Sequence, residues 1–261
     1  MKLLKKDTDD LNLFYEGKII HKTKDDVGTI LVLDYPKYRV MTFDSVCEQS
    51  CMNRARPEEL THKYTQAMML ALAFINPKHV TLLGLGGGCL LRAIHCVLPN
   101  VTLEAIEQRA AVIDVCDSFF GLPKVSHVNT HVYEGGQFLK QMQPGTTDII
   151  FADMYDEYAM DPTQEQETFL ISAYHALTST GCLVLNFHSL PDKESEFFIC
   201  LHQFFSDILI CTPSSGNYVL YASKARFKET ISEYSNAYKS IDRKINGQAS
   251  HLFRNIMRKS R

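Results

Sequence analysis

The sequence predicts an α/β fold, in which a mostly parallel sheet carries helices on both faces and follows a small antiparallel β unit. Three observations predict this fold. Residues 11–60 contain short strand-like runs without helical periodicity. From residue 58 to about residue 225, apolar strand-like runs alternate with runs of helical spacing. A glycine-rich turn joins the first of these later strands to the helix after it.

The first 57 residues are predicted to form an N-terminal β-hairpin domain. Its strands are expected in the runs LFYEGKIIHKTK, GTILVLDY and YRVMTFD, which are separated by Gly28 and by the turn at residues 35–36. Residues 58–225 are predicted to form the catalytic domain. Residues 226–261 are polar and partly periodic, so we expect a helical C-terminal tail there.

Within residues 58–225 the elements are expected to alternate in order. The predicted helices are EELTHKYTQAMMLALAFI, CLLRAIHCVL, AAVIDVCDSFF, GQFLKQM, QEQETFLISAYHAL and KESEFFICLHQFFSDI. The predicted strands are HVTLLGLG, VTLEAIE, VNTHVYEG, TDIIFADMY and CLVLNFH, with ILICTP and NYVLYAS as final strands and TSTG as a turn. Because ligands of such sheets bind at the carboxyl ends of the strands, we expect the functional site there.

Composition excludes several classes of function. The chain has 261 residues and a net charge of −3, so a chain-wide basic field for nucleic acid is absent. No apolar run is long enough to span a membrane. The eight cysteines form no C-x-x-C pair, so we expect no metal site and a cytoplasmic protein with reduced thiols.

The run VTLLGLGGGCLLR has the order strand, glycine turn, helix, with Gly84, Gly86 and Gly88 at alternate positions. Glycines let a ligand approach the backbone closely, and the helix that follows offers unpaired amides. Cys89 breaks the G-x-G-x-x-G dinucleotide pattern. The loop therefore favours a ligand with adenosine and no pyrophosphate; the alternative is a tight turn without a ligand.

Acidic residues stand at the predicted ends of three successive strands. Glu107 follows Gly88 by 19 residues, where a carboxylate can accept both ribose hydroxyls. Glu134 is placed to accept a hydrogen bond from an adenine amino group. Asp153 and Asp156 follow an apolar strand, where carboxylates can hold an ammonium group and one can act as a general base. The alternatives are solvated glutamates and a helix-capping aspartate.

Several stretches resemble the spermidine synthase (polyamine aminopropyltransferase) family, from about residue 43 to residue 222. They are FDSVCEQS, ELTHKYTQAMMLAL, LLGLGGGCLLRA, AIEQ, EGGQFL and DIIFADMYDEY. The resemblance implies a Rossmann-like sheet of the S-adenosylmethionine-dependent transferases. It also implies a homodimer and a reaction without metal, in which decarboxylated S-adenosylmethionine donates an aminopropyl group to a polyamine such as putrescine.

The resemblance also implies roles for individual residues. Asp153 takes the catalytic position, and the second aspartate, Asp156, the amine-binding position. Tyr64 and Gln49 line the substrate site. The cofactor-binding positions are Gly84, Gly86, Gly88, Glu107, Glu134 and Gly135.

Four positions depart from the family pattern. The loop aspartate, which in the family holds the aminopropyl ammonium, is replaced by Gly87, and the last loop glycine by Cys89. The proline after the second acidic residue is Glu157, and the residue after the tyrosine is Thr65. Two alternatives therefore stay open: an S-adenosylmethionine-dependent methyltransferase on the same fold, and a nucleoside-binding protein without catalysis.

Overall fold

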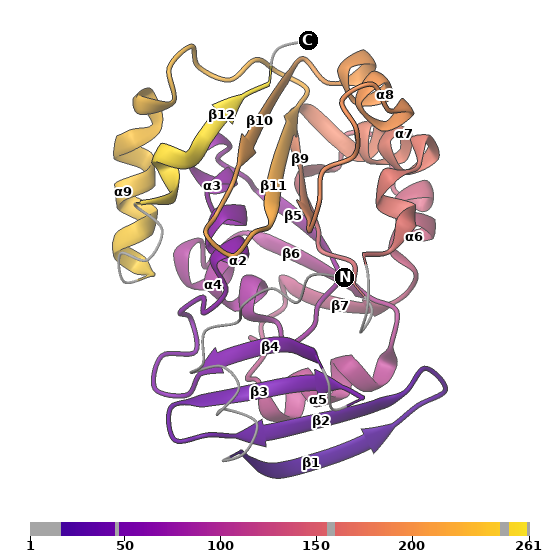
Figure 1. The fold of residues 1–261 in the computed structure, drawn as a ribbon, viewed down its shortest axis with the longest axis vertical. Coiled ribbons are helices and arrows are strands. Elements are labelled where there is room, and N and C mark those ends of the chain that lie inside the picture. Colours follow the sequence, from indigo (N-terminus) through magenta and orange to yellow (C-terminus); the bar gives the residue numbers. More distant parts are fainter. Residues whose placement is uncertain (1–16, 45–46, 156–159, 246–250, 260–261) are drawn as a thin grey trace.

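The computed structural model describes residues 17–44, 47–155, 160–245 and 251–259, which form a small sheet and a large one (Figure 1). The small N-terminal sheet is antiparallel, with its four strands side by side in chain order. They are β1 (Lys18–Lys24), β2 (Thr29–Asp34), β3 (Tyr38–Phe43) and β4 (Cys47–Asn53). Alternate residues of β2 face opposite sides of this sheet, and both sides are packed, since Ile30 and Val32 join the main core while Leu31 and Leu33 join a smaller cluster.

The large sheet has eight strands in the order β12-β10-β11-β9-β8-β5-β6-β7. Strands β5 to β9 are parallel, and β10, β11 and β12 extend the sheet by antiparallel pairing. The bounds of the parallel strands are β5 His79–Leu83, β6 Thr102–Glu107, β7 Val128–Val132, β8 Thr147–Ala152 and β9 Leu177–Phe187. Those of the antiparallel strands are β10 Asp207–Cys211, β11 Tyr218–Ser223 and β12 Ile256–Arg258.

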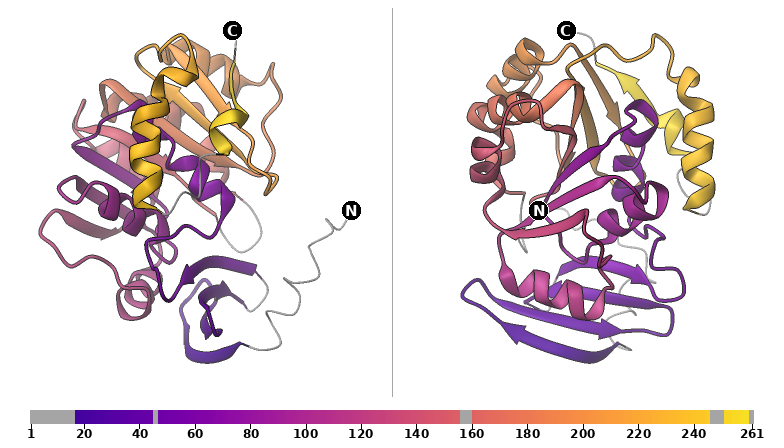
Figure 2. Two further views of the ribbon diagram at one scale, coloured as in Figure 1. Left: turned by 90° about the vertical axis from the view of Figure 1, so that its left-hand side faces the viewer. Right: turned by 180° about the vertical axis from the view of Figure 1, so that it is seen from behind.

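Helices cover both faces of the large sheet (Figure 2). On one face lie α2 (Lys63–Met68), α3 (Ala71–Phe74), α4 (Cys89–Val97), α5 (Ala110–Phe119) and α9 (Ser235–Lys244). On the other lie α6 (Gly135–Gln141), α7 (Glu167–Ala176) and α8 (Glu196–Phe204). The 3-10 helices in the described ranges are η1 (Pro162–Glu165), η2 (Ile231–Tyr234) and η3 (Leu252–Asn255). Helix α5 also contacts β2, so it lies between the two sheets.

The apolar strands have two buried faces, which explains their nearly continuous hydrophobic sequence. In β8, Ile149 and Phe151 pack into the core beneath α2, α4 and α5, whereas Ile150 and Ala152 pack into the core beneath α6, α7 and α8. The predicted α/β fold with an N-terminal antiparallel unit is confirmed. The division of the chain at residues 57 and 225 stays a prediction.

Two local predictions were wrong. The helix expected over EELTHKYTQAMMLALAFI is divided into α2 and α3 by a turn at residues 69–70, where every side chain is already buried. The run TSTG does not form a turn, because β9 begins at Leu177 and passes through this run with an irregular register against β8.

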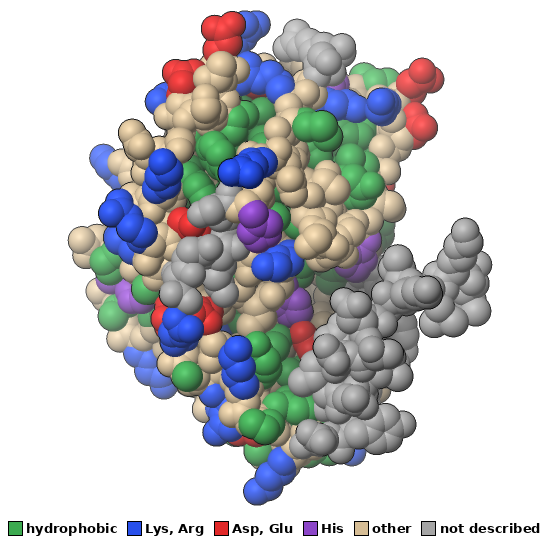
Figure 3. All heavy atoms as spheres, turned by 60° about the vertical axis from the view of Figure 1, so that its left-hand side comes forward, with side chains coloured by type: hydrophobic (Ala, Val, Ile, Leu, Met, Phe, Trp, Pro, Cys, Tyr) green, Lys and Arg blue, Asp and Glu red, His purple; other side chains and the backbone are tan. Residues whose placement is uncertain are grey.

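The face of the molecule drawn in Figure 3 has no large basic patch among the described residues, as expected from the net charge of −3. In Figure 3 the lysine and arginine side chains of one face are spread among hydrophobic and acidic ones. None of the helices in the described part of the chain combines the length and apolar character that a membrane crossing needs.

Candidate functional site

The glycine turn after β5 brings two strand ends together. Gly84, Gly86 and Gly88 have φ angles of 90°, 49° and 64°, a region that favours glycine. A Cβ atom on Gly84 would lie 2.3 Å from the carbonyl oxygen of Asp153. The segments that follow β5 and β8 therefore touch. These two strands are neighbours where the chain order of the sheet reverses, which is where ligands of such sheets bind.

Strand β4 of the small sheet closes over this turn. The Gly87 amide donates a 2.7 Å hydrogen bond to Ser50 Oγ. A Cβ atom on Gly87 would lie 2.7 Å from Ser50 Cβ and 3.1 Å from Phe120 Cδ1, so no space is left for a larger side chain there. A Cβ atom on Gly86 would lie 3.9 Å from the backbone oxygen of Gln49, which places the Gln49 backbone beside the turn.

Glu107 is the last residue of β6, and its carboxylate lies against the glycine turn. Oε2 accepts hydrogen bonds from the amides of Leu85 (3.1 Å) and Gly86 (3.4 Å), and Oε1 accepts one from the Arg109 amide (3.0 Å). A carboxylate has about four lone-pair sites, so these bonds fix its orientation. The structure thus holds an anionic acceptor at the turn.

Glu134 and Gly135 lie at the start of α6, after β7. The Glu134 carboxylate caps this helix, since it accepts bonds from the amides of Gly136 (2.6 Å) and Gln137 (2.7 Å). The sequence did not predict this capping contact, since the alternative stated for Glu134 was a solvated glutamate, and the adenine-binding role stays a prediction. A Cβ atom on Gly135 would lie 2.6 Å from Met154 Sδ, so this strand end also touches the segment after β8.

Asp153 follows β8 and is held by side chains from two other elements. Its Oδ1 accepts a 2.9 Å bond from Asn186 Nδ2 at the end of β9, and the Tyr64 hydroxyl of α2 donates a second bond. Burial raises the pKa of the Asp153 carboxyl above its ordinary value, and these two hydrogen bonds oppose that shift. The same surroundings, burial first and the Asp153 charge next, raise the pKa of Tyr64 well above its usual range.

The side chain of Asn186, which donates to Asp153, is itself held by the side chain of Asn217. Asn217 Nδ2 donates a 3.1 Å bond to Asn186 Oδ1, which leaves Asn186 Nδ2 to face Asp153. The Tyr155 hydroxyl donates a 3.0 Å bond to the Asn186 backbone oxygen. Both asparagines are buried. Asn186, Asn217 and Ser50 were not predicted from the sequence, although an asparagine at the end of the apolar run CLVLNFH is a usable signal.

His62 lies next to Tyr64 and contacts Glu48. The rings of His62 and Tyr64 are 5.6 Å apart, and His62 Nε2 lies 3.3 Å from Glu48 Oε1 on β4. The positive form of His62 also favours the charged form of Asp153 and so lowers its pKa. Glu48 of the small sheet therefore contacts His62, which precedes α2 and acts on the charge of Asp153.

The predicted site residues are thus joined by direct contacts. Gly84 contacts Asp153, Asp153 bonds to Tyr64, and Glu107 bonds to the Gly86 amide. The predicted amine-binding residue Asp156 lies outside the described residues. Within the described ranges, no group of three or more His, Cys, Asp or Glu side chains is arranged to hold a metal ion.

Comparison with known proteins agrees with this geometry. The profile of the Spermine/spermidine synthase domain matches residues 58–217, which is more than half of the chain. The chain belongs to the spermine/spermidine synthase family. It is 30% identical over 203 residues to the polyamine aminopropyltransferase of Neisseria meningitidis serogroup A, covering 73% of this chain and 77% of that protein.

The chain is also similar in sequence to a plant protein, and two solved structures share its fold. The spermidine synthase of Solanum lycopersicum is 30% identical over 175 residues, 63% of this chain and 48% of that protein. A probable spermidine synthase from Corynebacterium glutamicum superimposes with a TM-score of 0.76 at 17% identity, over 93% of this chain and 91% of that one. Human methyltransferase-like protein 13, in complex with SAH, has a TM-score of 0.60 at 19% identity, over 71% of this chain and 93% of that one.

Proposed function

We propose that this family member transfers an aminopropyl group from decarboxylated S-adenosylmethionine to a polyamine such as putrescine. One observation carries the proposal: the backbone of Asp153 lies directly against the glycine turn at Gly84, and Asn186 and Tyr64 hold the carboxylate of the same residue. An acceptor for an amine proton is thus next to the loop that would bind the nucleoside. The similarity to polyamine aminopropyltransferases supports the same reaction.

The reaction requires one bond to form and one to break. A neutral amine nitrogen attacks the carbon next to the sulfonium, and the C–S bond breaks with its electron pair remaining on sulfur. Methylthioadenosine leaves, and the new ammonium gives its proton to Asp153, which acts as the general base. Because the nitrogen must lie in line with the leaving sulfur, most of the catalysis comes from positioning.

The nucleoside half of the donor is proposed to bind along the carboxyl edge of the sheet. Glu107 accepts the ribose hydroxyls at the turn containing Gly86, and Glu134 with Gly135 lies beside the adenine. Tyr64 and Gln49 line the amine side. Asp156 as a second amine ligand and a homodimeric assembly stay predictions.

The methyltransferase alternative has one observation in its favour. Gly87 supplies no side-chain charge, and Ser50 with Phe120 occupies the space that a side chain at position 87 would need. The described turn therefore has no acidic side chain at position 87 to bind an aminopropyl ammonium or to repel the carboxylate of ordinary S-adenosylmethionine.

Donor and acceptor are tested in one experiment. Binding of S-adenosylmethionine, its decarboxylated form and methylthioadenosine is measured by calorimetry, and the products after adding putrescine are identified by mass spectrometry. Spermidine and methylthioadenosine are expected from the decarboxylated donor. A methylated amine from ordinary S-adenosylmethionine would instead identify a methyltransferase, and nucleoside binding without any product would identify a non-catalytic protein.

The pH dependence of the reaction provides a second test. Burial raises the pKa of Asp153 above its ordinary value of 3.8, so the acid limb of kcat/KM is expected at a higher pH than for an exposed aspartate. Tyr64 donates a hydrogen bond that favours the carboxylate. Tyr64→Phe removes this bond, and the acid limb should therefore move further toward higher pH.

The matched control for this test is Tyr174→Phe, the same exchange on α7, which covers the opposite face of the sheet. Its pH profile should coincide with that of the wild type. An acid limb that stays in place or moves to lower pH in Tyr64→Phe would contradict the role of Asp153 as the titrating base.

A further inference from the structure

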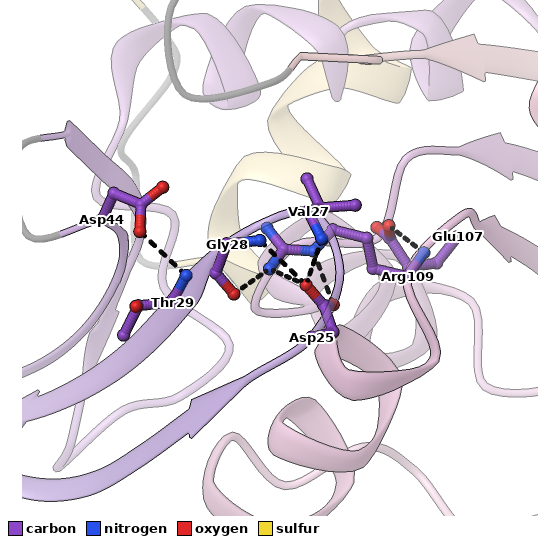
Figure 4. A network of polar contacts seen from close by, with 7 residues as sticks. All are labelled: Asp25, Val27, Gly28, Thr29, Asp44, Glu107 and Arg109. Atoms are coloured by element: carbon purple, nitrogen blue, oxygen red, sulfur yellow. Dashed lines mark hydrogen bonds and ion pairs between the residues drawn. The ribbon is translucent and has the colours of Figure 1, made fainter.

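Arg109 connects the turn between β1 and β2 to the strand end that carries Glu107. It lies two residues after Glu107, at the N-cap of α5, and only 9% of its surface is exposed. Its guanidinium donates to both carboxylate oxygens of Asp25, from Nε at 2.9 Å and from Nη2 at 2.8 Å, and Nη2 also lies 3.1 Å from the Gly28 backbone oxygen (Figure 4). Such a two-point Arg–carboxylate pair has a fixed geometry.

The Asp25 side chain is itself fixed by the turn. Its Oδ1 accepts bonds from the amides of Val27 (3.0 Å) and Gly28 (3.1 Å), in addition to the bond from Arg109 (Figure 4). The neighbouring Asp44 accepts a 2.8 Å bond from the Thr29 amide, so the start of β2 is held as well. The hydrogen bond from Arg109 keeps the pKa of Asp25 below its ordinary value, although burial opposes the shift.

The backbone amide of Arg109 faces Glu107, which lies at the glycine turn. Its amide donates the 3.0 Å bond to Glu107 Oε1, while its guanidinium lies 4.5 Å from the centre of the Phe43 ring. The side chain of Arg109 is therefore anchored in the small sheet, and the amide of the same residue orients the carboxylate at the glycine turn. Because a clamped side chain restricts its own backbone, the small sheet limits the positions that Glu107 can take.

We propose that Asp25 and Arg109 are positioning residues, through which the small sheet orients Glu107 for binding the nucleoside. The inference rests on the proposed nucleoside-binding role of Glu107. It assigns the N-terminal sheet a part in donor affinity, in addition to covering the turn through Ser50 on β4.

A second arginine, Arg39, also joins the small sheet to the rest of the protein, but none of its contacts among the described residues is near Glu107. Arg39 on β3 bonds to both oxygens of Asp34, at 2.6 and 2.8 Å, and its Nη1 donates a 2.6 Å bond to the Phe119 carbonyl at the end of α5. This pair also joins the small sheet to the rest of the protein, but its partners lie at the far end of α5 from Glu107. The two pairs therefore offer a matched comparison.

The test compares Asp25→Asn with Asp34→Asn in the full chain. Each exchange removes one carboxylate charge from an arginine pair and changes the shape of the side chain little. Methylthioadenosine binding is measured by calorimetry, kcat and KM for the donor are measured separately, and the melting temperature reports folding. Asp25→Asn should weaken methylthioadenosine binding by about tenfold and raise the donor KM with little change in kcat, because a small misplacement in a binding site has an effect of this size or larger. Asp34→Asn should leave the affinity unchanged.

The outcomes separate the inference from the proposed function. If the wild type binds no nucleoside, the proposed function fails. If the wild type binds methylthioadenosine and the two variants bind it equally well, the coupling through Arg109 is wrong and both pairs serve docking only. Should Asp25→Asn fail to fold, Arg109→Lys keeps the charge but loses the two-point geometry. An unchanged affinity in that variant would overturn the inference, and a several-fold weaker one would support it.

Discussion

Asp153→Asn should lower kcat for aminopropyl transfer by about 10²- to 10⁴-fold, the range by which a positioned general base contributes to catalysis. Asparagine has nearly the same shape as aspartate, but it cannot accept the proton that the attacking amine releases. The loop backbone at Gly84 and the carboxylate of Glu107 are unchanged in this variant, so methylthioadenosine affinity should stay within a few-fold of the wild type. The two quantities are measured by product mass spectrometry and by calorimetry.

Asp161→Asn serves as the control, because it is the same exchange eight residues further along the chain. Asp161 caps η1 with a 2.8 Å bond from the Thr163 amide, and asparagine caps helices as well as aspartate does. Its turnover should equal that of the wild type. If Asp153→Asn keeps full turnover, or if both variants lose activity equally, Asp153 is not the general base.

The backbone of the site could be predicted from the sequence, because its signals are local. A buried strand followed by glycines and an amphipathic helix defines the turn at Gly84, and the next carboxylates in the pattern stand at the ends of parallel strands. Such strand ends share one edge of the sheet whatever the details of packing. The order of elements therefore sufficed to place Glu107, Glu134 and Asp153 along that edge.

The supporting contacts could not be predicted, since they join residues that are far apart in the chain. Ser50 of the small sheet contacts Gly87 of the glycine turn. Asn186 on β9 contacts Asp153, which follows the neighbouring strand β8. Arg109 contacts Asp25, which lies 84 residues earlier in the chain. Ser50, Arg109 and Asp25 are polar residues without a distinctive pattern in their own stretches of sequence. Asn186 ends an apolar run, but that signal does not identify the residue it contacts. For the same reason the sequence did not reveal that β12 returns to pair with β10, because a three-residue strand has no periodicity to detect.

Gly84→Ala should destabilise the protein by roughly 2–5 kcal/mol and reduce turnover. Its φ of 90° is unfavourable for a residue with a Cβ atom, which costs about 1–2 kcal/mol. The added Cβ would also lie 2.3 Å from the carbonyl oxygen of Asp153, and relieving such overpacking costs about a further 1–3 kcal/mol. Since the atom in the way belongs to the backbone of Asp153, the structure can relax only by moving the proposed general base. Denaturant unfolding measures the first effect and kcat the second.

Gly121→Ala separates conformational strain from the steric clash. Gly121 also has a positive φ, 64°, but a Cβ atom there would meet nothing within 4 Å. This variant should therefore lose only the strain energy of about 1–2 kcal/mol and keep wild-type turnover. If the two variants lost equal stability and equal activity, the contact between the glycine turn and Asp153 would contribute nothing to the free energy of unfolding or to kcat. The expectation that Gly84→Ala displaces Asp153 would then be wrong.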